Sequence, residues 1–514
     1  MSENSRRIPL KWAVAPVHEL FDVVGGGTPS TDVAEYWHGP IPWITSADID
    51  ERHQITPRRS ISEQAIKNSA TNRVPAGSVI VVTRVGLGKV GIAETPICFS
   101  QDSQALIFNK DILLPKYVLL YMGTAVQVFK HISRGTTISG VTKKQLHDLE
   151  FRLPPPPEQK RIVDEIEKQF TRLDAAVAAL KRVQANLKRY RAAVLKAACE
   201  GRLVPTEAEL ARSENRSYEP ASVLLERILT ERRRRWENDQ LLRFREARKE
   251  PATNWKAKYK EPAGPHTTSL PTLPEGWTWA TFSQVIWQLR SGTSETAVRD
   301  VTDYPVLRSS AVRPGSVDFR DVSYLREEQS GRVQNYVQKG DVLVTRLSGS
   351  LEYVGVCALV VTQLTRAIQY PDRLFCAKLL DGVDGHFLSY CFRHQTFRSP
   401  MERAAKSTAG HQRISMSDLN LFTFALPPAE EQAAIVDAVE GRLSTIDHLQ
   451  ADLDVKLKSA QSLRQAILRR AFEGKLVPQD PCDKSASTLL DRIRAERQVE
   501  NRGSKKGAKE IVNR

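Results

Sequence analysis

The sequence has few cysteines and no long apolar run. Its six cysteines stand apart, with no Cys-x-x-Cys pair, which argues against a zinc site and against a disulfide framework. We expect them to be small hydrophobic residues of the core. No apolar run approaches the roughly 18 residues of a membrane span, and the start, MSENSRRIPLKW, lacks the apolar core of a signal peptide. The composition therefore predicts a cytoplasmic protein.

The motifs that serve nucleic-acid enzymes are missing as well. Gly86-Leu-Gly-Lys89 has the wrong spacing for a phosphate-binding GxxxxGK[ST] loop, and Gly25-Gly-Gly27-Thr-Pro stands in a loop pattern rather than at the start of a helix. The ten histidines form no cluster with metal-ligand spacing, and no Asn/Asp-Pro-Pro-Tyr/Phe sequence of an amino-methyltransferase is present. We therefore expect no catalytic, cofactor-binding or metal site in this chain.

Positive charge is in excess. The formal net charge of +15 at pH 7 suggests a polyanionic partner. Residues 153–270 hold 25 Lys and Arg against 17 Asp and Glu, so this middle segment carries +8 of the excess. It includes the run Arg232-Arg-Arg-Arg235-Trp236. A solvated helix face and a contact with phosphate or with a partner protein are both compatible with such a run.

One segment occurs twice in the chain. Shifted by 273 residues, residues 153–205 align without a gap on residues 426–478, and about 20 of the 53 pairs are identical, against roughly 1 in 15 expected by chance. LPPPPEQKRIVDEIE meets LPPAEEQAAIVDAVE, and CEGRLVP meets FEGKLVP. A second echo follows each copy, at residues 220–228 and 485–493. Such a chain is able to fold close to a two-fold symmetric dimer, and we expect its partner to have two halves.

The duplicated segments predict two long helices. Prolines precede each helix, an acid stands in its first turn, and Gly201 or Gly474 ends it. Apolar residues recur every three or four positions as a heptad seam. The seam consists of Ile162, Ile166, Phe170, Leu173, Val177, Leu180, Leu187 and Val194 in the first copy, and of Ile435, Val439, Leu443, Ile446, Leu453, Leu457 and Ile467 in the second.

The two seams need a cover. A helix over residues 158–200 would be about 65 Å long at 1.5 Å per residue. We expect the two helices to pair as an antiparallel coiled coil with pseudo-two-fold symmetry, which would separate the flanking regions like a ruler. The alternative is that each helix packs on its own domain or on a separate partner.

The regions before the two copies predict mixed α/β domains. Both contain short β-rich runs broken by Gly and Pro, such as residues 78–84 and 341–346. The expected organisation is α+β, with a globular domain at 1–152, a central helical region at 153–270, a second globular domain at 271–425 and a distal helical region at 426–514. The central region holds the spacer helix, a basic helix from Ala221 to about Lys249 and a linker. Shared runs with different loops are expected of two readers of different half-sites.

Polar and basic loop residues of both domains are suited to reading base edges. Arg pairs with guanine, Gln or Asn with adenine and Ser or Thr with either, at about 1–3 kcal/mol of discrimination per good pair. The first domain offers Thr28, Ser30, Thr45, Ser46, Arg84, Gln101, Arg134, Thr136 and Thr137. The second offers Arg308, Ser309, Arg346, Arg373, Lys406, Thr408, His411, Gln412 and Arg413. The sequence thus predicts a DNA-binding surface on each domain.

Taken together, these elements resemble the specificity (S) subunits of type I restriction-modification enzymes, over nearly the whole chain. The markers are Gly26-Gly-Thr-Pro-Ser30, Tyr36-Trp, Ile41-Pro-Trp-Ile44, Val81-Val-Thr-Arg84, the paired LPPPPEQKRIV and LPPAEEQAAIV starts, EGRLVP and EGKLVP, and Trp255-Lys-Ala-Lys-Tyr-Lys-Glu261. The second domain departs from the pattern. Ser291-Gly-Thr-Ser294 replaces Gly-Gly-Thr-Pro-Ser there, and no Ile-Pro-Trp-Ile follows.

The resemblance implies two target recognition domains, each reading one part of a bipartite, asymmetric site in double-stranded DNA. It also implies that the helices set the spacer and dock two modification (methyltransferase) subunits. Those subunits would bring S-adenosylmethionine and methylate adenine at N6, and restriction subunits would bring ATP- and Mg-dependent translocation and cleavage. The chain itself would be a non-catalytic subunit that binds no cofactor. The alternatives are a fused restriction-methylation enzyme with an unrecognised catalytic part, and a coiled-coil scaffold without a nucleic-acid role.

Overall fold

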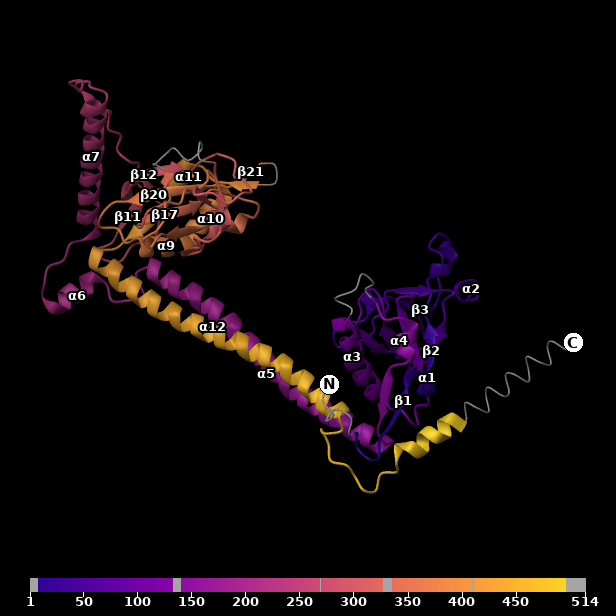
Figure 1. The fold of residues 1–514 in the computed structure, drawn as a ribbon. Coiled ribbons are helices and arrows are strands. Elements are labelled where there is room, and N and C mark those ends of the chain that lie inside the picture. Colours follow the sequence, from indigo (N-terminus) through magenta and orange to yellow (C-terminus); the bar gives the residue numbers. More distant parts are fainter. Residues whose placement is uncertain (1–7, 133–139, 269, 327–334, 409–410, 496–514) are drawn as a thin grey trace. The chain divides into compact units, whose positions relative to one another are not determined.

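The chain divides into two compact units, of residues 1–181 with 454–514 and of residues 182–453. The structure is a computed structural model that describes residues 8–132, 140–268, 270–326, 335–408 and 411–495 (Figure 1). We call the globular part of the first unit domain 1 (residues 8–153) and that of the second unit domain 2 (residues 277–426). Within the described ranges, no helix is both long enough and apolar enough to cross a membrane.

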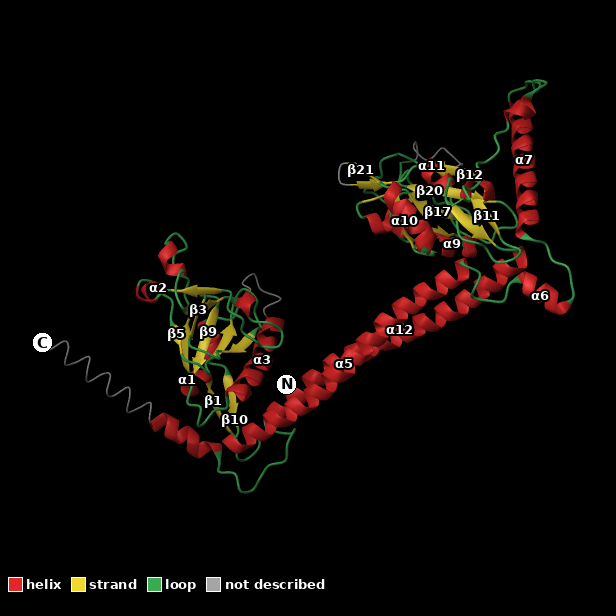
Figure 2. Cartoon of the chain, turned by 180° about the vertical axis from the view of Figure 1, so that it is seen from behind, coloured by secondary structure: helices red, strands yellow, loops and turns green. Residues whose placement is uncertain are grey.

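Domain 1 is built on two four-stranded sheets (Figure 2). One has the strand order β2-β9-β6-β7 and the other β4-β3-β8-β5, with only the β3–β8 neighbours parallel among these pairs. A separate antiparallel pair, β1 with β10, joins the start of the domain to its end. The strands are β1 (Ala13–Pro16), β2 (Asp22–Gly25), β3 (Ile41–Ile44), β4 (Arg59–Ile61), β5 (Arg73–Val74), β6 (Val79–Val82), β7 (Val90–Ile92), β8 (Ile97–Phe99), β9 (Ser103–Ile107) and β10 (Glu150–Leu153). The helices are α1 (Val17–Leu20), α2 (Glu63–Lys67), α3 (Pro115–Ile132) and α4 (Lys143–His147), with 3₁₀ turns at Ala34–Trp37 and Ser46–Asp48.

Strand β6 separates two cores of domain 1. Its four residues are all buried. Val79 and Val81 share one core with Tyr117 of α3, whereas Ile80 and Val82 share the other with residues of β3 and β8. Because successive side chains of a strand point to opposite faces, an unbroken apolar run requires cover on both. The strand expected within residues 78–84 is confirmed.

Domain 2 repeats this plan with a different outer part. Its central sheet has the order β12-β20-β17-β19, and β11 pairs with β23 as β1 pairs with β10. Smaller sheets are β13-β16, β14-β15 and β18-β22-β21. The strands are β11 (Thr278–Thr281), β12 (Ile286–Ser291), β13 (Pro305–Leu307), β14 (Val312–Arg313), β15 (Ser316–Val317), β16 (Val322–Tyr324), β17 (Asp341–Thr345), β18 (Leu347–Ser348), β19 (Cys357–Leu359), β20 (Leu374–Leu379), β21 (Lys406–Thr408), β22 (His411–Arg413) and β23 (Thr423–Leu426). The helices are α8 (Phe282–Val285), α9 (Gly385–Arg393), α10 (Gln395–Ala404) and α11 (Met416–Asn420), with 3₁₀ turns at Ser309–Ala311 and Leu351–Tyr353.

Strand β17 of domain 2 is the structural equivalent of β6. Its five residues are all buried. Val342 and Val344 belong to a core shared with α9, and Leu343 belongs to a second core on the opposite face. The run expected at residues 341–346 is confirmed as a strand, and the cover on both faces explains why it does not alternate with polar residues.

Helices α6 (Glu207–Glu214) and α7 (Ala221–Glu246) follow the first long helix. The helix expected from Ala221 to about Lys249 is confirmed as α7. Its first turns pack on domain 2, since Leu224 and Ile228 share a small core with Leu380. Beyond α7 the chain returns along it through a 3₁₀ turn at Trp255–Lys258, where the Trp236 and Trp255 rings stack with centroids 5.9 Å apart.

The two long helices are α5 (Pro156–Cys199) and α12 (Ala429–Phe472), each of 44 residues. In the first unit, Arg464 of α12 donates to Asp174 of α5 at 3.1 Å and lies 4.1 Å from the centre of the Phe170 ring. In the second unit, Arg191 of α5 donates to Asp447 of α12. Within each unit the two helices therefore contact each other, early residues of one meeting late residues of the other.

A buried Glu-Gln pair stands at the start of each long helix, Glu158-Gln159 in α5 and Glu431-Gln432 in α12. Gln159 of α5 is fully buried, and its amide donates to the carbonyls of Ile112 and Pro154 at 2.9 and 3.0 Å while accepting from the Leu114 amide at 2.8 Å. Each of these partners lies in domain 1 or at its end. Because a buried amide without partners is costly, these bonds lock the helix to the domain.

The second copy repeats the lock. Gln432 of α12 donates to the carbonyls of Gly382 and Pro427, both at 3.1 Å, and accepts from the Asp384 amide at 2.7 Å. Beside it, Glu431 accepts from the Trp277 indole at 2.8 Å and from the Glu207 amide at 2.9 Å. Burial raises the pKa of the Glu431 carboxyl, and the two bonds only partly oppose this.

Two glycines end the long helices in the same geometry. Gly201 and Gly474 have φ of +67° and +68°, and the amides of the next residues, Arg202 and Lys475, donate back to the carbonyls of Ala197 and Arg470 at 2.8 Å. This is a Schellman motif, which favours glycine because the left-handed conformation strains other residues. Both stops match the sequence prediction.

The cysteines follow expectation except at one position. Cys98, Cys357, Cys376 and Cys391 are buried, and Cys199 is half-buried. The expectation is wrong for Cys482, which is exposed in a turn after α12. Its surroundings are a tail segment rather than a domain core.

We predict that Gly474→Ala destabilises the first unit. The new Cβ would stand 2.2 Å from Cγ of Pro9 and 3.3 Å from the Trp12 indole, in a backbone conformation that L-residues avoid. The free energy of unfolding should fall by about 2 kcal/mol or more, as measured by urea denaturation. Gly441→Ala on α12 is the control, because a Cβ there meets nothing within 4 Å and should leave stability unchanged or raise it. Equal stability of Gly474→Ala and wild type would contradict the assignment.

We also predict a pH dependence from Glu431. Because its folded-state pKa is raised, its contribution to stability is full below its ordinary pKa of about 4.3 and is lost as the pH rises through the raised value. The stability of wild type relative to Glu431→Gln should therefore decrease between pH 4 and pH 7, as followed by urea unfolding. Glu430→Gln, at the exposed neighbour, should show no comparable trend. A flat difference for Glu431→Gln would contradict the burial argument.

Candidate nucleic-acid interface

The loop after β2 packs tightly against β8 in domain 1. The Gly27 amide donates to the Phe99 carbonyl at 2.9 Å, and the Gly26 amide to the Ser103 carbonyl at 3.3 Å. A Cβ on Gly26 would stand 2.2 Å from the carbonyl oxygen of Ser100. Glycine is required here because the two backbones approach each other closely. The loop places Thr28 at the edge of the domain.

The equivalent loop of domain 2 has the same backbone bonds despite its different sequence. The Thr293 amide donates to the Tyr370 carbonyl at 2.9 Å, and the Gly292 amide to the Leu374 carbonyl at 3.4 Å. A Cβ on Gly292 would stand 2.0 Å from the Tyr370 oxygen. By these bonds, Ser291-Gly-Thr-Ser294 occupies the structural place of Gly25-Gly-Gly-Thr28.

Three predicted residues of domain 1 meet at this edge. The Thr28 hydroxyl donates to the side-chain oxygen of Gln101, and both residues are exposed. The exposed Arg84 is held next to Gln101 by backbone bonds. The amides of Thr83 and Arg84 donate to the carbonyl of Asp102, the residue after Gln101, at 2.8 and 3.2 Å. A hydroxyl, an amide and a guanidinium therefore share one loop edge, and each is a type of group that is able to bond to a base edge.

Ser46 approaches the same edge from β3. The missing Cβ of Gly86, two residues after Arg84, would lie 3.0 Å from the Ser46 Cβ. The Lys89 ammonium donates to the Ser46 carbonyl at 2.8 Å. Lys89 was not among the predicted site residues, although the Gly86-Leu-Gly-Lys89 turn that places it was visible in the sequence.

Thr45 has a structural task instead. Its hydroxyl bonds to the carboxylate of Asp48 at 2.8 Å, and that carboxylate also accepts from the Thr45 amide and from Arg58, at 2.7 and 2.6 Å. Burial acts to raise the pKa of Asp48, but the bonds from Arg58 and Thr45 outweigh it and the pKa is lowered. Thr45 caps the following turn. Because its hydroxyl is already bonded there, it is poorly suited to contact a base.

The other predicted residues of domain 1 are more distant from this cluster or outside the described ranges. Ser30 is exposed, and its carbonyl accepts from the Trp37 indole at 3.0 Å. Arg134, Thr136 and Thr137 lie outside the described residues.

In domain 2, Arg346 occupies the position of Arg84. Its amide donates to the Arg373 carbonyl at 2.9 Å, as that of Arg84 does to Asp102. Its guanidinium donates to the Asp372 carbonyl at 3.2 Å and to the Ser291 hydroxyl at 3.4 Å. Arg346 is half-buried and part of its bonding capacity holds the loops together.

Other basic residues surround Arg346. Strand β22 pairs with β18, which places Arg413 opposite Leu347 and Gln412 opposite Ser348. Arg373 and Arg413 are exposed, and Gln412 is half-buried. The structure therefore gathers Arg346, Arg373, Gln412 and Arg413, and the predicted site of domain 2 is richer in arginine than that of domain 1.

The remaining candidates of domain 2 lie around this group. Arg308 is the residue before the turn Ser309–Ala311, as Thr45 is before Ser46–Asp48, and donates to the Ser323 hydroxyl at 2.9 Å. Ser309 is half-buried, and His411 is exposed at the start of β22. The backbone of Lys406 and Thr408 lies in β21, while their side chains are outside the described set.

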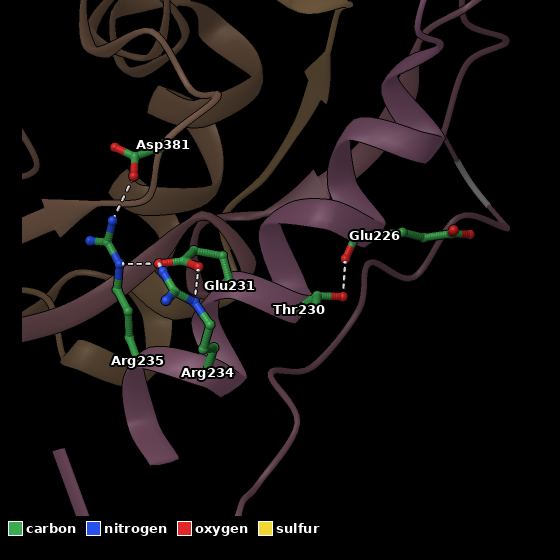
Figure 3. A network of polar contacts seen from close by, with 6 residues as sticks. All are labelled: Glu226, Thr230, Glu231, Arg234, Arg235 and Asp381. Atoms are coloured by element: carbon green, nitrogen blue, oxygen red, sulfur yellow. Dashed lines mark hydrogen bonds and ion pairs between the residues drawn. The ribbon is translucent and has the colours of Figure 1, made fainter. Parts of the chain in front are cut away.

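The arginine run of α7 is paired within the protein. Glu231 accepts from Arg234 at 2.6 and 2.9 Å and from Arg235 at 2.7 Å, and Arg235 reaches Asp381 of domain 2 at 2.6 Å (Figure 3). Bonds from Arg234 and then Arg235 lower the pKa of Glu231 to about 2. Arg232 donates to the Ile286 carbonyl at 3.1 Å and to the Tyr259 hydroxyl at 2.8 Å. These contacts favour the protein-facing interpretation of the run over phosphate binding.

No group of at least three His, Cys, Asp or Glu side chains is placed to hold a metal ion among the residues that the structure describes. The interface consists instead of hydroxyls, amides and guanidiniums at loop edges. These groups are suited to recognition of an extended polar surface rather than to bond-breaking chemistry.

A protein-family model describes part of the chain. Residues 9–187, which contain domain 1 and most of α5, match the type I restriction modification DNA specificity domain. The EcoKI specificity subunit of the type I restriction enzyme from Escherichia coli (strain K12) is 24% identical, over 98% of this chain and 99% of that protein. The chain is thus similar, over nearly its whole length, to type I specificity subunits. The resemblance predicted from the sequence is confirmed.

Further relatives agree. The MjaIX specificity subunit from Methanocaldococcus jannaschii is 34% identical over 30% of this chain and 37% of that protein. Among solved structures, a chain described under complex assembly and conformational transition of the type I R-M system matches 91% of this chain and 100% of its own length, with 17% identity and a TM-score of 0.59. That likeness shows a shared fold of mixed helix and sheet.

We predict unequal roles for the arginines of α7. Arg232→Met should lower the free energy of unfolding by about 1–2 kcal/mol, because it removes a half-buried group bonded to a backbone carbonyl and a tyrosine. Arg234→Met should change the free energy of unfolding by less than about 0.5 kcal/mol, because Arg234 only forms an exposed ion pair with Glu231 on the same helix. Urea unfolding measures both, and equal effects would contradict the assignment.

Proposed function

We propose that this chain is the sequence-specific DNA-binding specificity subunit of a type I restriction-modification complex, and that it is not itself catalytic. The observation that carries the proposal is the pair of loop edges. Domains 1 and 2 repeat the same backbone bonds at Gly27 and Thr293, yet present different side chains. Two readers of different sequence on one scaffold suit a bipartite, asymmetric site in double-stranded DNA.

The readers differ in chemistry. Around Thr28, Arg84 and Gln101, domain 1 offers one guanidinium with a hydroxyl and an amide. Domain 2 offers the arginine-rich group at Arg346, Arg373 and Arg413. Because Arg pairs with guanine and with phosphate, whereas Gln pairs with adenine, we expect domain 2 to favour a guanine-containing half-site.

The helices α5 and α12 are proposed to form an antiparallel coiled coil that sets the distance between the half-sites, giving the chain pseudo-two-fold symmetry. Asp174 lies 17 residues before Arg191, and Arg464 lies 17 residues after Asp447, so the two interhelical ion pairs are in one antiparallel register. Paired heptad seams would follow from that register.

The partners follow from the same proposal. Two modification subunits would dock on the helical regions, and restriction subunits would join through them. S-adenosylmethionine, ATP and Mg would be bound by those subunits and not by this chain. Exposed apolar side chains on the long helices, such as Val183 and Tyr190 on α5 and Val455 and Leu463 on α12, would be covered by such docking.

Mapping of methylated adenines tests the proposed function. DNA from cells that carry this chain with a modification partner should show a bipartite motif with one spacer length, and none without this chain. Methylation by the purified chain alone, or S-adenosylmethionine binding by it, would instead support a fused enzyme. A methylation pattern that does not depend on this chain would support a scaffold.

We predict that Arg373→Ala and Arg84→Ala each weaken a different half-site. Each should reduce site-specific methylation by the assembled complex about 5- to 150-fold, the equivalent of about 1–3 kcal/mol, and relax one half of the motif only. Arg320→Ala is the control, because that side chain is highly exposed and pairs with its neighbour Asp318. Unchanged methylation in both site variants would exclude these loop edges as the readers.

A further inference from the structure

A cavity of about 480 Å³ lies in the second unit, between the last turns of α5 and domain 2. None of its lining residues belongs to the candidate nucleic-acid interface. Six of them carry basic side chains: Lys188, Arg191 and Lys196 from α5, and Arg393, His394 and Arg398 from the α9–α10 corner. Glu352 is the acidic residue of the lining. Burial lowers the pKa of His394, so the positive charge of the lining comes from its three arginines and two lysines.

Two of these basic groups are accounted for by the protein. Arg398 donates to the carbonyls of Val354 and Glu352 at 2.6 and 3.1 Å and pairs with Glu402 at 3.1 Å. Arg191 pairs with Asp447 of α12. These contacts shape the cavity. They occupy Arg398 on several sides, whereas the single ion pair of Arg191 leaves most of its five N–H donors for a further acceptor.

Arg393 is different. It is half-buried at the end of α9, and among the described residues no hydrogen bond or ion pair involves its side chain. Its pKa is lowered, first by burial and then by the nearby charge of Arg191, while Asp447 acts in the opposite direction. The carbonyl end of α9 contributes about half a negative elementary charge, and Asp447 is shared with Arg191. This leaves two neighbouring guanidiniums only partly balanced.

A planar guanidinium that is desolvated and unpaired lacks the bonds that normally compensate its burial. An oxyanion placed between Arg393 and Arg191 would supply them, and Lys188 and Lys196 would add long-range attraction. The rest of the wall is apolar, with Leu195, Val356 and Phe392. The site thus combines an anionic corner with a surface for a flat or apolar group, in a volume typical of small-molecule pockets.

We propose that this cavity binds an organic phosphate of about mononucleotide size, with the phosphate on Arg393 and Arg191 and the organic part on the Leu195–Phe392 wall. The ligand would rest on α5 and on domain 2 at once. Its binding would therefore hold domain 2 against α5. This role does not depend on what the loop edges recognise.

The test uses the full chain in phosphate-free buffer of constant ionic strength, with AMP, pyrophosphate or adenosine as the probe. AMP should raise the midpoint of thermal unfolding of the wild type by several degrees, pyrophosphate by less, and adenosine not at all. Absence of an AMP-dependent shift, or an equal shift with adenosine, would overturn the proposal. A shift with pyrophosphate but none with AMP would overturn the organic part of it.

Substitution of Arg393 separates a ligand site from a structural arginine. Arg393→Met should abolish the AMP shift and should leave unchanged or raise the midpoint without ligand, because it removes an unpaired buried charge. A lowered midpoint without ligand, or a preserved AMP shift, would contradict the assignment. Arg189→Met, on the same helix but outside the lining, is the matched control and should keep the shift.

A milder variant guards against a folding defect. Lys196 is exposed at the rim of the cavity, so Lys196→Met should fold normally. It should weaken AMP binding about two- to fivefold in calorimetry, since one long-range cationic partner is lost. An unchanged affinity would contradict the contribution that the proposal assigns to Lys196.

Discussion

The burial of a Glu-Gln pair at the start of each long helix is the interaction on which the rest of the structure depends. Gln159 and Gln432 each satisfy both ends of their amide on backbone groups of the adjoining domain. When one partner of a buried amide moves away, a donor or acceptor is left without a hydrogen bond, and the folded state loses stability. The bonds therefore fix the angle at which each domain leaves its helix, and with it the direction of each loop edge.

Duplication explains why both junctions look alike. The stops at Gly201 and Gly474 have nearly equal φ angles and face the same pair of residue types, a proline and a tryptophan. In the first case these are Pro274 and Trp277, and in the second Pro9 and Trp12. Each domain is thus clasped between the start of one long helix and the end of the other, within its own unit. Repetition preserved the clasp, while the loop edges diverged.

Much of this frame could be predicted from residue patterns alone. The starts and stops of the helices follow from the positions of proline, acidic residues and glycine. The short apolar runs of β6 and β17 predict strands, and they are apolar throughout because a core covers each face. The match between Gly27 and Thr293 could not be predicted, because the bonds are made by the backbone and the side chains differ. It emerges only from the amide partners.

The candidate site was harder to predict than the frame. Thr28, Arg84 and Gln101 do come together, but Thr45 is consumed by Asp48, and Arg346 partly by the loops around it. The sequence does not point to Lys89, because the spacing of Gly86-Leu-Gly-Lys89 argues only against a phosphate loop and says nothing of its contact with Ser46. The arginine run of α7 carries its own counter-charges, several of them one helical turn away and Asp381 far along the chain. Which polar groups are already satisfied is a property of the fold, and composition does not reveal it.

The central claim is that α5 and α12 measure the distance between two half-sites. Removing residues 175–181 from α5 together with residues 457–463 from α12 deletes one heptad from each helix in the proposed register. The rod should shorten by about 10 Å, the length of roughly three base pairs. Mapping of methylated adenines should then show the same two half-sites with a spacer about three base pairs shorter. An unchanged spacer in a complex that still assembles and methylates would contradict the account.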